Sequence, residues 1–366
     1  MMKILKAIDL FSGAGGTTAG LKKSGIQVVS AVEIDSNAGK TYKFNNPEVN
    51  LIIDDIKNIK KEDLDESIKE NDQLLLVACP PCQGFSSIRR GGELDVRNQL
   101  VFEFLRLINE MKPEYILMEN VSGMSRGKGK KIFSKFYAEL IKFYNVTFDI
   151  LNAADYGVPQ IRKRLVLHGI RKKIAIAFDL KIELPSKTHS KNGNKLPKWI
   201  NSSIIMDLPS INAGESYIDP NNKIFNHIAN GLSELNKKRI IYIRKHGGSR
   251  DCLPPSLTKN WHRNLNLHKD VYGILDIKKP AITITGGCMN FSKGRFGHPR
   301  DNRALSAREA ARLQSFDDDY IFFGNKSQLA SQIGNAVPVK LAESSGKYFV
   351  NLNKEMLFRK RRNERI

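Results

Sequence analysis

Strand and helix signals alternate from Lys6 to about Ile170, and no other feature of the chain restricts its fold as strongly. Short apolar runs, each long enough for a buried strand, are separated by segments whose apolar residues recur at helical spacing. This alternation predicts an α/β fold, a doubly wound and mostly parallel sheet with helices on both faces. The expected strands cover 7–10, 28–32, 51–53, 74–78, 115–118, 146–151 and 165–170, and a crossover helix is expected over 98–111.

The chain changes character after about Arg171, where short apolar pieces are broken by proline, glycine and asparagine up to about Arg300. Its 366 residues exceed the length of most single domains, so a second, irregular domain is expected there. Helical order returns at Ser306, which forms a capping-box pattern with Glu309. A further helix is expected to begin near Pro338, because proline is well tolerated in a first helical turn.

The chain is strongly basic, with 59 Lys and Arg against 38 Asp and Glu and a net charge of +21. This charge favours a polyanionic partner, nucleic acid first, although a composition that only solvates the surface would carry the same charge. The basic end, 358–365, is interpreted as a solvated helix end. No apolar run approaches the ~20 residues of a membrane span, and residues 1–10 lack the features of a signal peptide. We therefore expect a cytoplasmic protein without membrane contact.

Four cysteines are too few for a disulfide scaffold in a chain of this size and are consistent with a reducing compartment. Cys79 and Cys82 form a CxxC pair, a spacing found in zinc sites and in redox centres. Because Cys252 and Cys288 do not form a second pair, no metal site is expected. A CxxC oxidoreductase is an alternative, but it gives no role to the basic charge or to Glu119.

A thiol and a carboxyl are expected at the carboxyl-terminal edge of the sheet, where open α/β sheets bind their ligands. Cys82 follows the run 74–78, and Glu119 follows the run 115–118. Two prolines before Cys82 and Gln-Gly after it make a rigid turn rather than a core position. Backbone N–H groups at a helix start would lower the thiol pKa. The combination predicts a nucleophilic cysteine and covalent catalysis.

A glycine-rich turn at 11–16 follows the first expected strand and lets a ligand approach the backbone closely. It fits a dinucleotide fingerprint only in part, because Thr18 occupies the third glycine position. Glu33 follows the second strand, and Asp54 and Asp55 follow the third, so more carboxylates should reach the same edge. Each acid alone would be read as a loop or capping residue, but together with the glycine turn they predict an adenosine site.

Three further segments carry basic residues suited to nucleic acid. Arg162 and Arg164 stand just before the last expected strand and share a face if that strand has begun, so they could grip a base and a phosphate or form a surface cluster. Residues 245–250 combine glycine with basic side chains, and 259–264 interleave aromatic and basic ones. Both are suited to contacts with nucleic acid, and both are equally compatible with ordinary solvated loops.

Six motifs, in order along nearly the whole chain, resemble those of the DNA cytosine C5 methyltransferases that use S-adenosylmethionine. Six ordered motifs are far more specific than any single one. They are Phe11-Ser12-Gly13-Ala14-Gly15-Gly16, Pro81-Cys82-Gln83, Glu119-Asn120-Val121, Gln160 to Arg164, Arg308 to Gln314 and Gln332 to Pro338.

The resemblance implies a Rossmann-like catalytic domain of the class I methyltransferase type over 1–175 and a target-recognition region in a smaller domain over 176–302. Residues 303–366 would add a helix to the small domain and then return to the catalytic domain. Duplex DNA would be the substrate, bound in the cleft between the domains, and the protein would act as a monomer. The compact length favours the modification half of a bacterial restriction–modification system, with a cognate endonuclease as its functional partner.

By motif match, Cys82 attacks C6 of cytosine while Glu119 engages N3, so that C5 takes the methyl group. Arg164 would contact the base and Arg162 would support it. The cytosine would be flipped out of the duplex to reach these groups. The residues expected around S-adenosylmethionine are Phe11, Gly13, Gly15, Gly16, Glu33, Asp55, Ile56, Pro81, Leu100 and Asn335.

Two departures from the family pattern stand out. Asp54 occupies a position where glycine is frequent, which leaves open which carboxylate faces the adenine, and Asp317 follows Phe316 where proline is common. Two rival functions also stay open. A related branch methylates cytosine in tRNA, but its Cys-Phe-Thr motif does not occur in this sequence. A catalytically silent DNA-binding protein of the same fold is disfavoured by intact Cys82 and Glu119. The DNA target sequence does not follow from the sequence.

Overall fold

The structure is a computed structural model that describes residues 5–66, 68–69, 72–81, 99–258 and 270–363. The chain forms two compact units. Unit 1 comprises Met1–Asn152, Lys163–Lys187 and Val339–Ile366, and unit 2 comprises Ala153–Arg162 and Thr188–Pro338.

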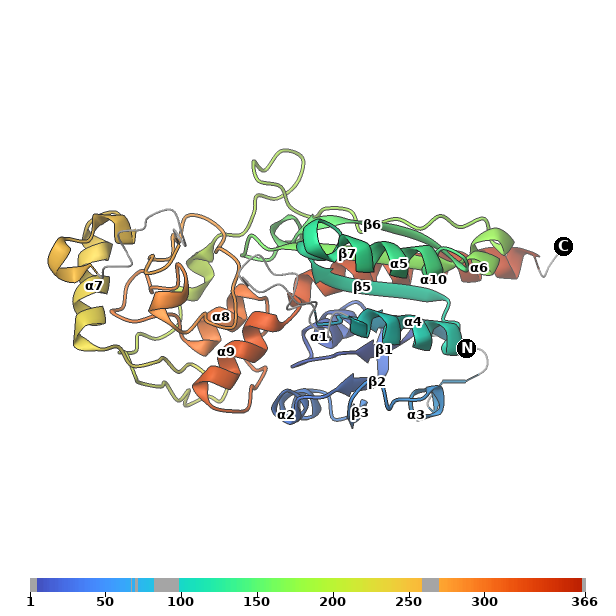
Figure 1. The fold of residues 1–366 in the computed structure, drawn as a ribbon, viewed down its shortest axis with the longest axis horizontal. Helices are drawn as coiled ribbons and strands as arrows, with labels where there is room; N and C mark the ends of the chain where they lie inside the picture. Colours follow the sequence, from blue (N-terminus) through green and yellow to red (C-terminus); the bar gives the residue numbers. More distant parts are fainter. Residues whose placement is uncertain (1–4, 67, 70–71, 82–98, 259–269, 364–366) are drawn as a thin grey trace. The chain divides into compact units, whose positions relative to one another are not determined.

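Unit 1 is built on a seven-stranded sheet with strand order β3-β2-β1-β4-β5-β7-β6 (Figure 1). The first five strands in this order run parallel, whereas β7 is antiparallel to both β5 and β6. The predicted doubly wound, mostly parallel α/β sheet is therefore confirmed, and most strands are slightly longer than predicted. The strands are β1 Leu5–Leu10, β2 Gln27–Glu33, β3 Asn50–Ile53, β4 Gln73–Ala78, β5 Tyr115–Val121, β6 Tyr144–Asn152 and β7 Lys163–Arg171.

The central strands β1 and β4 are buried on both faces, which explains their nearly continuous apolar sequences. The predicted crossover helix is present as α4, Leu100–Met111, and its Phe104 and Ile108 pack into the main core with Ile8 and Leu76. The other helices of unit 1 are α1 Gly16–Lys23, α2 Ser36–Asn45, α3 Lys61–Asp65, α5 Lys130–Leu140, α6 Lys172–Ala177 and α10 Val339–Asn363, with 3-10 turns at Ser122–Met124 and Gly127–Gly129.

Helices α10 and α5 cover opposite faces of the sheet. Phe349 of α10 lies against His168 and Tyr115, with ring centroids 4.5 and 5.7 Å apart. Phe136 of α5 instead belongs to the core cluster that contains Leu167. Because neighbouring residues of a strand point to opposite faces, Leu167 and His168 of β7 assign the two helices to different sides.

Unit 2 has short elements separated by loops, in keeping with the predicted irregular domain. A core cluster contains Ile240 and Ile243 of one helix together with Tyr272 and Phe291. The elements are α7 Glu234–Lys245, α8 Ala307–Leu313 and α9 Lys326–Asn335, with 3-10 turns at Ala153–Tyr156, Ser202–Ile205, Arg250–Cys252, Pro255–Leu257 and Phe291–Lys293. Among the described helices of both units, none is long and apolar enough to cross a membrane.

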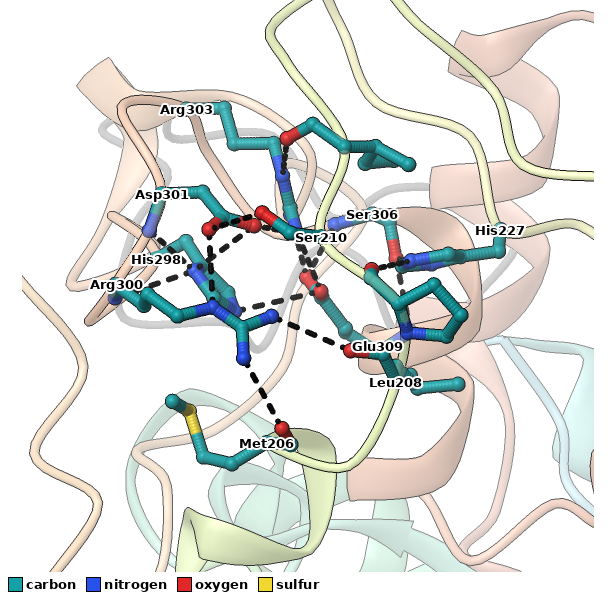
Figure 2. A network of polar contacts seen from close by, with 12 residues as sticks. Met206, Leu208, Ser210, His227, His298, Arg300, Asp301, Arg303, Ser306 and Glu309 are labelled. Atoms are coloured by element: carbon teal, nitrogen blue, oxygen red, sulfur yellow. Dashed lines mark hydrogen bonds and ion pairs between the residues drawn. The ribbon is translucent and has the colours of Figure 1, made fainter.

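The predicted capping box starts α8, since Ser306 Oγ accepts a hydrogen bond from Glu309 N at 3.1 Å. Glu309 also belongs to a buried ionic network (Figure 2). Arg303 donates to both Glu309 oxygens at 2.7 and 2.8 Å and to Asp301 Oδ2 at 2.7 Å. The His298 ring lies beside them, and burial lowers its pKa to about 4, so it is neutral at neutral pH. Removing one partner of such a buried pair typically costs about 3–5 kcal/mol, because the remaining charge stays buried without compensation.

Candidate active site

Glu119 lies at the carboxyl-terminal edge of the sheet. The parallel pairing of β4 with β5 ends at Ala78 and Met118, so the chain leaves β4 beside the position of Glu119. Pro81 is the last described residue before Cys82, and Cys82 itself lies outside the described residues. The structure therefore places the acid and the beginning of the cysteine segment at adjacent strand ends, as predicted, without describing the thiol.

Arg164 forms an ion pair with Glu119, with 3.0 Å between Arg164 Nε and Glu119 Oε1. Both side chains are about one-seventh exposed. Arg164 comes from β7, which pairs antiparallel with β5 and so brings this guanidinium to the carboxyl edge. Burial lowers the pKa of Arg164, although the Glu119 charge opposes this effect. A carboxyl fixed in this way can hold or protonate a ring nitrogen.

Asn120 holds the start of the cysteine segment in place. Its buried side chain donates from Nδ2 to the Pro80 carbonyl at 3.0 Å, and its Oδ1 accepts from Val121 N at 2.7 Å. Cys79 N also donates to the Leu10 carbonyl of β1 at 3.3 Å. The sequence analysis gave Asn120 no role of its own, although its place in the Glu-Asn-Val motif was a usable signal.

The glycine-rich turn between β1 and α1 leaves room for a ligand. Gly13 and Gly15 have φ of +56° and +91°, a region that favours glycine. A Cβ built on Gly13 would meet nothing within 4 Å among the described residues. Glu33, at the end of β2, accepts a hydrogen bond from Gly13 N at 2.7 Å and others from Ile34 N and Asp35 N. Glu33 therefore fixes the turn, and burial raises the pKa of its carboxyl.

The acids after β3 differ in their exposure and contacts. Asp54 is exposed, and its Oδ1 accepts from Asp55 N at 2.6 Å and from Asn58 Nδ2 at 2.8 Å. Asp55 is half-buried, and its Oδ1 accepts from Lys57 N at 3.1 Å. Ile56 is buried in the main core. Asp54 thus acts as the capping side chain of this turn, which favours Asp55 as the acid available to a ligand.

Several predicted cofactor residues of unit 1 lie along one edge of the sheet, as an adenosine site requires. The strand order places the ends of β3, β2, β1 and β4 side by side, so Asp55, Glu33 and the glycine turn share one edge. Phe11 and Leu100 are partly buried against the core beneath this edge. Asn335 belongs to unit 2, where it ends α9 and donates from Nδ2 to Ser331 Oγ at 3.3 Å.

A buried polar cluster beneath the glycine turn was not predicted. Thr18 Oγ1 donates to Asp9 Oδ2 at 2.7 Å and lies 2.8 Å from the Tyr42 hydroxyl. Asp9 is fully buried, and burial raises the pKa of its carboxyl to about 7. Cys79 Sγ lies 3.6 Å from Thr17 Oγ1. Burial, with the Glu119 and Asp9 charges, raises the pKa of the Cys79 thiol, so this cysteine is a poor nucleophile.

Arg162 and Arg164 were expected to share a face only if the strand had already begun at Arg162, and this condition is not met. β7 begins at Lys163, so Arg162 precedes it and belongs to unit 2. Its buried guanidinium donates to the carbonyls of Ile284 at 2.7 Å and Gly334 at 3.0 Å. Arg162 is thus held by backbone carbonyls, and any effect on catalysis would be a positioning one.

Gln160 makes comparable contacts within unit 2. Its Oε1 accepts from Ile284 N at 2.8 Å, and its Nε2 donates to the Leu313 carbonyl at 2.9 Å. Gln314, at the end of α8, accepts from Gln160 Nε2 and donates to the Ile333 carbonyl at 2.7 Å. The motifs at 160–164, 308–314 and 332–338 are therefore joined by hydrogen bonds. These contacts give Gln160 and Gln314 a structural role.

A sequence model described as C-5 cytosine-specific DNA methylase matches residues 5–351. Type II methyltransferase M1.HphI of Haemophilus parahaemolyticus is 31% identical over 356 residues, which cover 95% of this chain and 87% of that protein. Type II methylase M.HgiDII of Herpetosiphon aurantiacus is 33% identical over 343 residues, which cover 91% of this chain and 92% of that protein.

A solved structure leads to the same family. The crystal structure of a putative DNA modification methyltransferase encoded within a prophage, from E. coli, has a TM-score of 0.70 at 26% identity. It covers 96% of this chain and 99% of that one. The motifs, the sheet with its Glu119–Arg164 pair and these likenesses agree, and the chain belongs to the C-5 cytosine-specific DNA methylase family.

Proposed function

We propose that this chain transfers the methyl group of S-adenosylmethionine to C5 of cytosine in a specific duplex DNA sequence, as the methylase of a restriction–modification system. The observation that carries the proposal is the Glu119–Arg164 ion pair at the carboxyl edge of the sheet, beside the strand end that leads to Cys82. The type II names of the relatives support DNA as the substrate and a cognate endonuclease as a functional partner. We expect a single copy of the chain to act on the duplex.

Catalysis would begin with Cys82 and Glu119. The Cys82 thiolate forms a bond to C6 while Glu119 gives a proton to N3, and the displaced electron pair makes C5 nucleophilic. Arg164 keeps the Glu119 carboxyl directed toward the base. When bound, S-adenosylmethionine supplies an electrophilic methyl group, which C5 takes. Loss of the C5 proton to water or hydroxide, cleavage of the bond between Cys82 Sγ and C6, and return of the N3 proton to Glu119 then release 5-methylcytosine.

The target base would have to leave the duplex before this chemistry. C6 and C5 are stacked between neighbouring bases, and N3 is paired with guanine, so Cys82 and Glu119 cannot reach them in intact DNA. Flipping costs a few kcal/mol in lost stacking and pairing. The partly buried Glu119 and Arg164 would compensate by hydrogen bonding to the flipped base.

The cofactor would be held by the carboxyl ends of β1 to β4. Glu33 would accept hydrogen bonds from the ribose hydroxyls, and Asp55 from the adenine amino group. The open space at Gly13 admits the methionine part close to the backbone. Ile56, Pro81 and Leu100 would provide apolar contacts, with Phe11, Gly15, Gly16 and Asn335 completing the set expected from the motifs.

Methyl transfer is tested on unmethylated plasmid DNA. The purified protein is incubated with S-adenosylmethionine, and modified cytosines are mapped by bisulfite sequencing. We expect protection confined to one short sequence. Cys82→Ala should abolish it, whereas Cys79→Ala, the matched control in the same CxxC pair, should keep most of it because Cys79 is protonated and hydrogen-bonded.

Two results would contradict the proposal. If the Cys82→Ala protein still methylates DNA, the covalent mechanism is wrong. If the wild-type chain binds S-adenosylmethionine but protects no cytosine, duplex DNA is not its substrate. A labelled-methyl assay with tRNA then tests the related RNA activity.

A further inference from the structure

The basic end of α10 lies at the edge of the sheet opposite to Glu119. Arg359 Nη1 donates to the carbonyls of Phe178 and Asp179, at 2.9 and 2.7 Å, just after α6. Helix α6 follows β7, whose end pairs with the start of β5, at Ile170 and Tyr115. At about 1.5 Å per residue, α10 runs roughly 30 Å from its start to Arg359. Figure 1 shows the end of α10 beside α6.

We call residues 171–183 and 354–362, around α6 and at the end of α10, the α6–α10 surface. Basic residues greatly outnumber acidic ones on it. The acids are Asp179, Glu183 and Glu355, of which two pair with Arg359. The cations are Arg171, Lys172, Lys173, Lys181, Lys354, Arg359, Lys360, Arg361 and Arg362.

Within the described residues, most of these cations have no acidic partner. Arg361 and Arg362 are exposed in the last turn of α10, and Lys173 is exposed in the first turn of α6. Within the described part of the chain, their side chains make no ion pair or hydrogen bond. Among the described residues, the positive charge of this surface is therefore largely unpaired, and the surface is distant from the edge that carries the proposed chemistry.

We propose that the α6–α10 surface binds the sugar–phosphate backbone of duplex DNA, at a second stretch beyond the one that holds the target cytosine. This inference rests on the proposed function only for its choice of DNA. Exposed lysines and arginines on a helix end reach phosphates without demanding a base sequence, and each contact releases counterions. Such a site would keep the enzyme near long DNA between encounters with its target.

An acidic protein is the competing occupant. Phe143, Ile176 and Phe358 are 59, 78 and 70% exposed near this edge, and apolar side chains among cations suit a protein interface. They come from three separate segments, however, and single exposed apolar residues are common on protein surfaces. The cations are more numerous and lie on adjoining helix ends, which favours DNA.

The test measures equilibrium binding of the full chain to a fluorescein-labelled linear duplex several helical turns long, over a range of salt concentrations. The variants are Arg361→Gln with Arg362→Gln on α10, and Lys172→Gln with Lys173→Gln on α6. The control, Lys40→Gln with Lys60→Gln, removes the same charge from exposed positions on α2 and just before α3, outside the α6–α10 surface.

Each test pair should bind the long duplex at least about tenfold more weakly at low salt, and the slope of log K against log salt should fall by about 2. The control pair should keep the wild-type slope. Methyl transfer to a duplex just long enough for the target should be unchanged in all variants. Unfolding curves will confirm that the exposed substitutions leave the fold intact.

Equal losses in test and control pairs would mean that only net charge matters, and the proposal would be wrong. Wild-type binding by both test pairs would also overturn it and would leave an acidic protein as the occupant. A failure of this proposal can be distinguished from a failure of the proposed function, because the binding assay needs neither S-adenosylmethionine nor methyl transfer.

Discussion

Asp9 is the residue whose behaviour is least expected from the sequence. It lies next to the glycine turn, yet its carboxyl is fully buried, and Thr18 is its donor in the structure. Burial raises its pKa to about 7, so the folded chain holds this proton up to about pH 7. The unfolded chain releases it near 3.8. The contribution of Asp9 to the free energy of unfolding is therefore fully present below about pH 4 and is lost as the pH rises to about 7.

Asp9→Asn should remove this loss. We therefore compare the free energies of unfolding of Asp9→Asn and the wild type. At about 1.4 kcal/mol per pH unit, the difference between them should shift in favour of Asp9→Asn by up to about 4 kcal/mol between pH 4 and pH 8. Urea denaturation at several pH values measures the difference. Asp319→Asn, at an exposed position, is the control and should follow the wild type. Parallel curves for Asp9→Asn and wild type would show that Asp9 does not bind a proton in the fold.

The position of a side chain at the sheet edge was easier to predict than its hydrogen-bond partners. Glu119 was predicted because a carboxyl after an apolar run must emerge at the edge of the sheet, and the structure places it there. The hydrogen-bond partners of Arg162 were not predicted, because the carbonyls of Ile284 and Gly334 are distant in sequence. The role of Asn120 likewise depends on a backbone carbonyl that no pattern of side chains marks.

The elements followed the periodicity of apolar residues closely. All seven predicted strands and the crossover helix are present, because each buries an apolar face or run. The antiparallel direction of β7 was not predicted. Direction depends on the connection before a strand, and the segment between β6 and β7, 153–162, contributes to unit 2 instead of forming a crossover helix.

Helices α1 and α10 approach closely at Gly20. A Cβ on Gly20 would collide with the Val339 carbonyl oxygen, and it would lie 2.6 Å from Ala342 Cβ and 2.7 Å from Glu343 N. Most of these atoms are backbone or Cβ atoms that cannot rotate away. Gly20→Ala should therefore move α10 off α1 and destabilise the fold by about 1–3 kcal/mol or more, as overpacking does.

Chemical denaturation of Gly20→Ala tests this packing. Gly231→Ala is the matched control, because a Cβ there meets nothing within 4 Å among the described residues. We expect its stability to stay close to that of the wild type. If Gly20→Ala is as stable as this control, the close packing of α1 on α10 is not required.

At the scale of the whole molecule, the chain passes repeatedly between its two units. The motif from Gln160 to Arg164 straddles one boundary, so that Arg162 belongs to unit 2 and Arg164 to unit 1. Neighbouring residues of one motif thus stabilise different units. The return of the last segment to the first unit was expected from the resemblance, but the transfer of Ala153–Arg162 to unit 2 depends on contacts that are distant in sequence and could not be read from the motifs.

A ligand that binds only the native state should stabilise the whole chain. S-adenosylmethionine at about 100 times its Kd would add about 2.7 kcal/mol and raise Tm. Glu33→Gln should lose most of this increment, because the proposed acceptor of the ribose hydroxyls loses its charge. Glu48→Gln, at an exposed acid paired with Lys22, is the control and should keep the full increment.

The comparison uses the ligand-induced change in Tm rather than Tm itself, since Glu33 also fixes the glycine turn through Gly13. A lower Tm without ligand is therefore compatible with the proposal. S-adenosylhomocysteine, which shares the adenosine part, should show the same pattern in both variants. If Glu33→Gln gains as much from either ligand as the control does, Glu33 has only a structural role and the adenosine site lies elsewhere.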